Sequence, residues 1–409
     1  MQKNARNFIW DCCFCMSAYW VCSGTVIASL TSYYDLPLAL SNVLTGLTST
    51  LLVLQLLGGY LYTRTRARFL FLRVINLLWR LFLPLVFFSV LLPKTIGAPV
   101  MIFTYFCGIA IYQFASPSQT DWLVGTVEGR VKRNYYAIRE MFFMLAYTAV
   151  FCTASMLINH ANLTQTYKTG FFIIACVITV LFGASIVTLF KLPAPENAPA
   201  APLPLRKSFI EPFRNKPFCG VLFTNMLWSF SSMFVGNFAA IYQIRILNLS
   251  FTQIMIWATV GNLIRAFFTP VLAKLSAVIS WKRTVALCLV MLASVALGWM
   301  VVTPENITIL FPILSILGAV PFAGLGVGFL ELQVNTAPSA SRSLYFSVTA
   351  SMNGLASFIG SLVCSALIEA IVQMAPATVN STLRSIFCVG LVGALLSAVL
   401  ALRIHSDVK

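Results

Sequence analysis

Residues 191–216 read KLPAPENAPAAPLPLRKSFIEPFRNK, and this stretch decides how the rest of the chain is interpreted. Five prolines fall between Leu192 and Leu205, where they interrupt any helical hydrogen-bond ladder, and the charged residues need water. About 190 residues precede the stretch and about 190 follow it, and both sides are rich in apolar runs of roughly 20 residues, long enough to span a bilayer. The sequence therefore predicts a membrane protein of two halves, residues 1–190 and 217–409, joined by a linker over residues 191–216.

The composition points to the same class of protein. Hydrophobic residues make up 59% and charged residues 9% of the 409 residues, with a mean hydropathy of +0.89, whereas a soluble domain carries about 25% charged residues. The net charge of +16 comes from short basic clusters between apolar runs. Membrane topology explains such clusters, so we expect the lipid bilayer as a partner and no nucleic acid.

The cysteines and histidines predict no metal site. Almost all of the eleven cysteines fall inside apolar runs, where they are expected to be buried thiols. Only His160 and His405 could join them as ligands, so a constellation of His and Cys cannot be assembled. We expect neither a metal nor a cofactor.

The apolar runs predict twelve membrane-spanning helices, and hence an all-α integral membrane fold in two six-helix bundles. They cover about residues 7–30, 36–61, 69–92, 98–121, 135–158, 169–190, 218–244, 251–275, 283–302, 307–330, 344–372 and 383–402. Because the number is even, both termini are expected on one side of the membrane.

The basic residues of the loops predict which side that is. About 21 Lys and Arg residues fall on the side of the termini and about 4 on the other, at Lys94, Lys168, Arg245 and Arg384. Cytoplasmic loops carry such an excess, so the sequence predicts a multi-pass protein of the cell (inner) membrane with both termini and the linker in the cytoplasm.

The two halves repeat one another between their fourth and fifth spans. DWLVGTVEGRVKRNYYA begins at Asp121 in the first half, and ELQVNTAPSASRSLYFS begins at Glu331 in the second. Without gaps, the alignment pairs Asp121 with Glu331, Thr126 with Thr336, Lys132 with Arg342, and Tyr135 with Tyr345. This correspondence indicates a duplicated six-helix unit.

With these features the chain resembles the major facilitator superfamily of secondary transporters over essentially its whole length. Its turn between the second and third spans reads GYLYTRTRAR and keeps Gly59, Leu61, Arg64 and Arg68 of the signature of that family. It departs from the signature at Thr63, where the family has aspartate, and at Arg66, where it has glycine. The resemblance implies two bundles that rock about a central site and give alternating access to a small-molecule substrate.

The charges around the repeated loops suggest a cytoplasmic gate. We expect Arg64 or Arg68 to pair with Asp121, and Arg342 to pair with Glu331, in one state of the transport cycle. Alternatively, these are solvated interfacial charges that fix topology only.

Two arginines lie deep in predicted spans. Arg80 is about 18 Å along its helix from Arg68, and Arg265 is similarly central in the eighth span. A guanidinium there costs at least about 2.5 kcal/mol, so each should face the protein interior, although no central acidic partner is evident. Either these arginines lock helices together, or they provide positive potential for an anionic substrate.

The resemblance further implies a central cavity lined by the first, fourth, seventh and tenth spans. Polar and aromatic residues near the middle of these spans are expected to contact substrate, and the alternative for each is helix packing: Tyr19, Trp20, Gln113, Asn225 and Trp228.

Energy coupling requires a group that changes charge. Glu140 and Asp11 lie near helix ends, where a partly dry carboxylate can carry a proton between inward and outward states. The alternatives are a static ion pair, such as Asp11 with Arg139, and transport by uniport or exchange.

These interpretations predict a secondary active transporter that moves a small organic solute, with an anion and a coupled proton favoured, working as a monomer. No nucleophile and base or metal set suggests an enzyme. The alternatives are an exporter of neutral or cationic amphiphilic compounds, or a transport-inactive receptor or scaffold.

Overall fold

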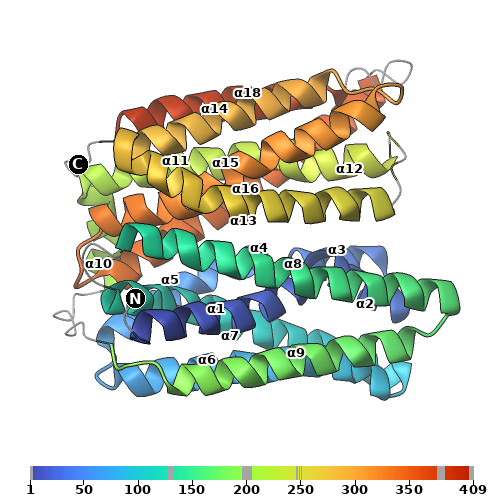
Figure 1. Ribbon diagram of the computed structural model, residues 1–409, viewed down its shortest axis with the longest axis horizontal. Coiled ribbons are helices and arrows are strands. Elements are labelled where there is room, and N and C mark those ends of the chain that lie inside the picture. The colour runs from blue at the N-terminus through green and yellow to red at the C-terminus, as the bar shows by residue number, and fades with distance from the viewer. Residues whose placement is uncertain are drawn as a thin grey trace. The chain divides into compact units, whose positions relative to one another are not determined.

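The computed structural model describes residues 3–127, 132–195, 205–245, 251–374 and 383–404, together with Leu247 and Leu249. These residues form helices and their connections, and no strand occurs among them (Figure 1). The all-α membrane fold predicted from the apolar runs is therefore confirmed.

Within the described residues, nine helical segments are long and apolar enough to cross a membrane without a break. They are built from α6 (Arg68–Phe88) with η2 (Ser89–Leu91), α7 (Lys94–Thr126), α8 (Lys132–Thr164), α9 (Tyr167–Phe190), α11 (Lys216–Ser232) with part of the π-helix η4 (Met233–Asn237), α13 (Phe251–Ile279), α14 (Trp281–Met300), α15 (Ile307–Thr336) and α16 (Arg342–Met374). α12 (Phe238–Arg245) follows η4, and α18 (Ile386–Leu402) occupies the last predicted span.

The first two predicted spans are interrupted. α1 (Lys3–Val21) and α2 (Gly24–Tyr33) meet at an angle of 42°, at Gly24, which has a φ of 57°. Glycine adopts this left-handed conformation readily. The second span is divided into α3 (Leu38–Thr45), α4 (Leu47–Thr50), η1 (Leu51–Val53) and α5 (Leu54–Arg64). The hydroxyls of Thr45 and Thr50 donate to backbone carbonyls there, and such bonds compete with the regular ladder.

The chain divides into two compact units. The first contains residues 1–135, 139–203 and 339–347, and the second contains residues 136–138, 204–338 and 348–409. The division falls inside the predicted linker, which also holds a short helix, α10 (Leu205–Arg214). The first residues of α16 are thus grouped with the first unit, and residues 136–138 of α8 are grouped with the second. The sequence did not predict either assignment.

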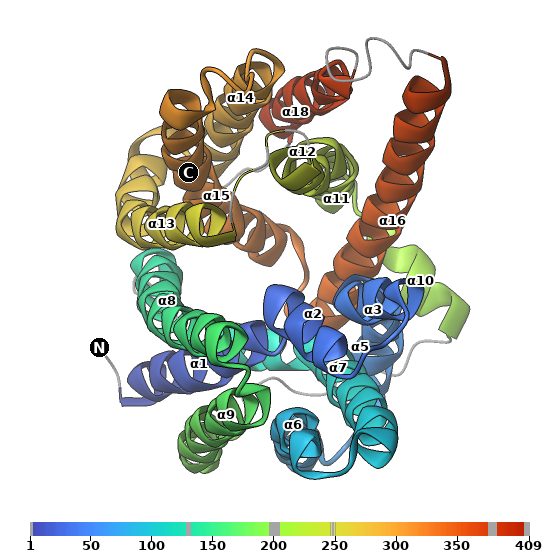
Figure 2. The same ribbon diagram turned by 90° about the vertical axis from the view of Figure 1, so that its right-hand side faces the viewer.

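In the first unit, α6 packs against α7 and α9, α1 packs against α9, and α5 packs against α7 (Figure 2). Small residues permit the closest approaches. A Cβ at Gly58 would overlap the carbonyl of Phe114 on α7, and a Cβ at Gly59 would overlap the hydroxyl of Ser347 at the start of α16. Gly59, the glycine of the signature turn, therefore lies where two helices approach too closely for a side chain.

We expect Gly58→Ala to destabilise the protein, because the added methyl meets backbone that cannot move aside. Overpacking of this kind costs about 1–3 kcal/mol. Gly183→Ala on α9 is the matched control, since nothing lies within 4 Å of a Cβ there. Thermal unfolding in detergent should show a lower midpoint for Gly58→Ala alone, and equal midpoints for the two variants would contradict the packing described here.

In the second unit, α14 packs against α15 and α18, α13 packs against α15, and α11 packs against α18 (Figure 2). Aromatic side chains fill the core between these helices, including Phe234, Tyr242, Trp299 and Phe387. The rings of Trp299 and Phe387 stack with centroids 6.0 Å apart. Several residues of this core, among them Val295, Trp299 and Phe311, also line the cavity described next.

Candidate functional site

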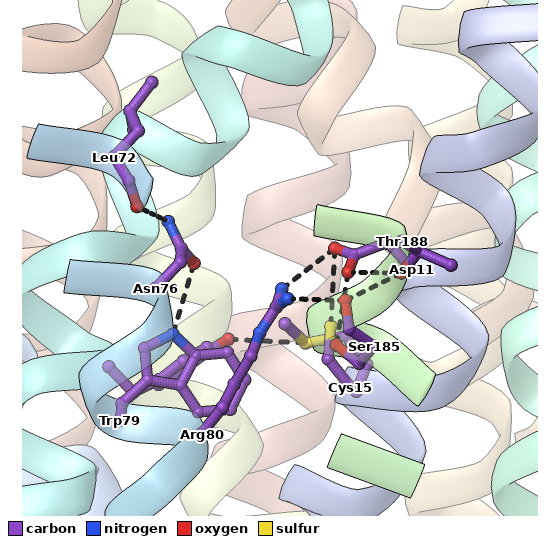
Figure 3. A network of polar contacts seen from close by, with 10 residues as sticks. Asp11, Cys15, Leu72, Asn76, Trp79, Arg80, Ser185 and Thr188 are labelled. Carbon is purple, nitrogen blue, oxygen red and sulfur yellow. Dashed lines mark hydrogen bonds and ion pairs between the residues drawn. The ribbon is translucent and has the colours of Figure 1, made fainter. Parts of the chain in front are cut away.

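An ion pair between α1 and α6 lies in the interior of the first unit. Asp11 Oδ2 lies 2.9 Å from Nη2 of Arg80, and both side chains are buried (Figure 3). Arg80 Nη1 donates to the Ser185 carbonyl on α9 at 3.1 Å. The second carboxylate oxygen of Asp11 accepts from the hydroxyls of Ser185 at 3.2 Å and Thr188 at 3.0 Å. The pair therefore joins three helices, and both carboxylate oxygens are hydrogen-bonded.

Asp11 is the central acid that the sequence analysis did not identify for Arg80. From the sequence, Asp11 was expected near a helix end, with a static pair such as Asp11 with Arg139 as the alternative to proton coupling, whereas the structure pairs Asp11 with Arg80. Linear depth along each helix does not show which faces of α1 and α6 meet, so the pairing could not be predicted. A buried charge pair is stabilised when its remaining hydrogen-bonding groups are also satisfied. The hydroxyls of α9 satisfy the carboxylate of Asp11, whereas Nε of Arg80 is buried without a hydrogen-bond partner.

A small polar cavity of about 120 Å³ adjoins Asp11. Arg139 and Asp11 both border it, so the two residues share a cavity although the ion pair of Asp11 is with Arg80. Glu140, the second candidate for proton coupling, is half-buried on α8 and is not among the lining residues. The other lining residues are Phe8, Cys12, Cys15, Met16, Tyr112, Ser116, Gln119, Thr120 and Leu123.

The predicted substrate contacts of the first unit are engaged elsewhere or exposed. Gln113 accepts from Gln55 at 2.8 Å and donates to the Thr48 carbonyl at 2.7 Å, so its amide joins α7 to the broken second span. Tyr19 is buried among aromatic rings, and Trp20 is 51% exposed. In this structure Gln113 and Tyr19 contact other helices, and their role in substrate binding stays a prediction.

The second unit contains a larger cavity of about 520 Å³. It brings together two residues singled out in the sequence, Trp228 on α11 and Arg265 on α13. Asn225 is buried on α11 but lies outside the lining. The wall includes five further residues that the sequence analysis missed, namely Gln243, Trp257, Asn262, Trp299 and Phe322.

A helical stripe on α13 could have revealed part of this wall. The stripe consists of Ile254, Trp257, Ala258, Gly261, Asn262 and Arg265, all of which line the cavity. Steps of three and four residues place side chains on one face of a helix. Given Arg265 as a starting point, the same spacing leads back to Asn262 and Trp257.

The residues of the predicted gate include one ion pair that the sequence did not predict. Arg342 Nη1 lies 3.9 Å from Asp121 Oδ1. The expected pairs of Asp121 with Arg64 or Arg68, and of Arg342 with Glu331, stay predictions. Arg64 lies over the ring of Tyr60, and Arg68 lies over the ring of Tyr62 and donates to the Thr63 carbonyl. Glu331, the expected partner of Arg342, is buried on α15. The ion pair thus connects the repeated loop motifs of the two halves, and no spacing within either motif predicts it.

Solved structures with the same fold include transporters for several kinds of solute. A bacterial homologue of the iron transporter ferroportin, in an outward-facing state with soaked iron, aligns with a TM-score of 0.72 and 14% identity over 99% of this chain and 100% of its own. The proton:xylose symporter XylE aligns with a TM-score of 0.65 and 13% identity, covering 96% and 94%. The human organic anion transporter MFSD10 (TETRAN) aligns with a TM-score of 0.64 and 14% identity, covering 96% and 98%.

No curated protein matches the sequence. A family model, Major Facilitator Superfamily, matches residues 9–361, which is most of the chain. Together with the helical fold and the solved structures that share it, this match shows that the chain belongs to the Major Facilitator Superfamily, whose members are transporters.

Proposed function

We propose that the protein is a proton-coupled secondary transporter of a small organic anion, and that the 520 Å³ cavity around Arg265 is its binding site. The observation that carries this proposal is the different placement of the two central arginines. Arg80 is wholly buried and bonded to Asp11, whereas Arg265 lies in the wall of the cavity. A guanidinium beside a cavity in a low-dielectric interior favours a ligand that brings a carboxylate or another oxyanion.

The fold alone does not determine which substrate the protein binds. The three structural neighbours are described as binding soaked iron, as a proton:xylose symporter and as an organic anion transporter. The choice therefore depends on the cavity of this chain. Among the described residues, no three His, Cys, Asp or Glu side chains are grouped so that they could hold a metal ion. Positive charge in the cavity also opposes the cationic amphiphiles of the alternative exporter.

Ligand-induced stabilisation tests this proposal. Thermal unfolding of the purified protein is measured with benzoate, succinate, glucose 6-phosphate, glucose and tetraphenylphosphonium. The proposal expects one or more anions to raise the unfolding midpoint, by mass action on the folded state. Stabilisation by the cation or by the neutral sugar alone would favour the exporter, and a transport-inactive scaffold would respond to none of the five.

We propose Asp11 as the group that carries the proton. Its carboxylate borders the small polar cavity and also holds Arg80. Protonation would remove the negative charge that compensates Arg80. Proton binding would therefore be coupled to the ion pair between α1 and α6 and to the packing of both helices against α9.

Uptake with and without an inward proton gradient tests this role. The double variant Asp11→Asn with Arg80→Gln removes both charges, which avoids leaving one of them buried alone. We expect it to retain substrate exchange but to lose stimulation by the gradient, whereas Glu140→Gln should keep that stimulation. The opposite pattern would transfer the coupling role to Glu140.

We propose that Asp121 and Arg342 close the cytoplasmic side in one state of the cycle. Asp121 is 3% exposed, so water cannot readily hydrate its carboxylate in place of the ion pair with Arg342. Asp121→Asn should weaken the closed state and raise the labelling rate of cysteines introduced on the cytoplasmic side, with Arg66→Gln as the exposed control. Labelling rates equal to those of the wild type would leave the pair with a purely structural role.

A further inference from the structure

We infer that the substrate is an aromatic monocarboxylate or a similar planar monoanion, bound in the cavity of the second unit. This inference rests on the proposed function and names the substrate class of the same cavity. Arg265 would hold the acidic group, and the indoles around the cavity would hold the ring. Three properties of the wall support it: its aromatic content, its single charge and its open glycine positions.

Indole rings come to this cavity from three different helices. Trp228 belongs to α11, Trp257 to α13 and Trp299 to α14, and all three line the cavity. Trp228 lies 6.2 Å from Phe322 between ring centroids, and Trp299 lies at the same separation from Phe311. Both phenylalanines line the cavity as well. Aromatic rings prefer offset or edge contacts with other rings, so this wall favours a planar aromatic body over an aliphatic one of equal size.

The charge of the wall sets the charge of the ligand. Arg265 is the only charged side chain among the described residues that line the cavity. One guanidinium can compensate one carboxylate through a bidentate pair. A second carboxylate on the ligand would lose its hydration without a second cation, and a ligand cation would be repelled. Asn262, one turn before Arg265, and Gln243 on α12 can bind a hydroxyl or carbonyl group on the ligand.

The glycines of the wall leave space for the ligand, and the volume of the cavity limits the size of the ligand. Gly236, Gly261 and Gly318 all line the cavity. A Cβ at Gly236 would have no neighbour within 4 Å, and at Gly261 and Gly318 the nearest atoms lie at 3.7 and 3.8 Å. A side chain added at these positions therefore occupies cavity space without a clash near its Cβ. Since cavities of about 300–1,000 Å³ hold small organic ligands, the 520 Å³ here suits one or two fused rings.

The experiment compares matched ligands by isothermal titration calorimetry on the full-length protein in detergent. Benzoate and cyclohexanecarboxylate share one charge and differ in aromaticity, phthalate adds a second charge, and benzamide removes the charge. We expect benzoate to bind about fivefold more tightly than cyclohexanecarboxylate, within the range of one aromatic contact. Phthalate should bind at least about tenfold more weakly than benzoate, and benzamide should show no measurable binding.

Two variants locate these preferences in the wall. Trp257→Leu keeps the wall apolar but removes a ring, so it should lower benzoate affinity toward that of cyclohexanecarboxylate and leave the latter unchanged. Gly261→Val should weaken 2-naphthoate more than benzoate. Gly183→Val, at an open position on α9 in the first unit, should alter neither. The unfolding midpoint of each variant is measured alongside, so that a loss of folding is recognised.

The outcomes separate this inference from the proposed function. If benzoate and cyclohexanecarboxylate bind equally, and both are lost in Arg265→Gln, the aromatic preference is wrong and anion binding stands. If phthalate binds as tightly as benzoate, the single-charge argument is wrong. If no carboxylate binds but glucose 6-phosphate does, this inference fails and the proposed function stands. If no anion binds, or if binding survives in Arg265→Gln, the proposed function fails and this inference fails with it.

Discussion

Arg265→Gln should abolish anion binding and transport while leaving the protein folded. The guanidinium lies in the wall of a 520 Å³ cavity, so its removal takes away the charge that compensates the ligand. Charge-assisted hydrogen bonds of this kind contribute about 1.5–3 kcal/mol, and leaving a ligand carboxylate without a cation in a dry site costs more. We therefore expect a loss of anion affinity of at least about 100-fold.

A second basic residue of the same unit provides the control for this variant. Arg283 is exposed at the start of α14, outside the cavity. Arg283→Gln also lowers the net charge by one, so it tests whether the overall positive field is sufficient to attract the anion. Equal affinity losses in the two variants, or an unfolded Arg265→Gln, would contradict the role of Arg265 as a ligand-binding residue.

Arg80→Gln should instead reduce the amount of folded protein. Its guanidinium joins Asp11 on α1 to the Ser185 carbonyl on α9 (Figure 3). Its side chain is 0% exposed. Breaking a buried ion pair by removing one partner costs about 3–5 kcal/mol, because the other charge stays buried without compensation. Thermal unfolding and size-exclusion profiles in detergent should show this loss.

A double variant separates charge from packing at this pair. Asp11→Asn combined with Arg80→Gln leaves no buried charge, so it should be more stable than either single variant. Arg73→Gln is the control on the same helix, because Arg73 donates to the Phe190 carbonyl near the exposed end of α9. A double variant no more stable than the single ones would show that shape, and not charge, holds these helices together.

The sequence predicted the fold well because bilayer thickness and backbone hydrogen bonding leave few options. Apolar runs of the right length, a proline-rich linker and a repeated motif were enough to predict the family and the fold class. The interruptions were harder to predict. The break at Gly24 and the division of the second span at Thr45 to Thr50 depend on the backbone conformation of single residues. Mean hydropathy is averaged over a whole window and does not reveal such conformations.

The site was predicted only in part, for a related reason. Hydropathy and depth identified Arg80 and Arg265 as unusual but could not distinguish their environments, because both occupy the middle of an apolar run. The distinction depends on the face of each helix. Arg80 lies on the face of α6 that meets Asp11 and Ser185. Arg265 and Asn262 lie on the face of α13 that lines the cavity. The environment of each arginine depends on contacts between separate helices, and these contacts cannot be predicted from the residue spacing within one helix.

Uptake of permanently ionised probes into proteoliposomes tests the central claim most directly. Radiolabelled benzenesulfonate and pentanesulfonate keep their charge at all working pH values and do not cross a bilayer unaided, so uptake reports the protein alone. The account predicts uptake of at least one probe by the wild type, competition by unlabelled carboxylates, and no uptake by Arg265→Gln above empty liposomes. Uptake of both probes at equal rates by wild type and Arg265→Gln, or uptake of tetraphenylphosphonium in their place above the level of empty liposomes, would contradict it.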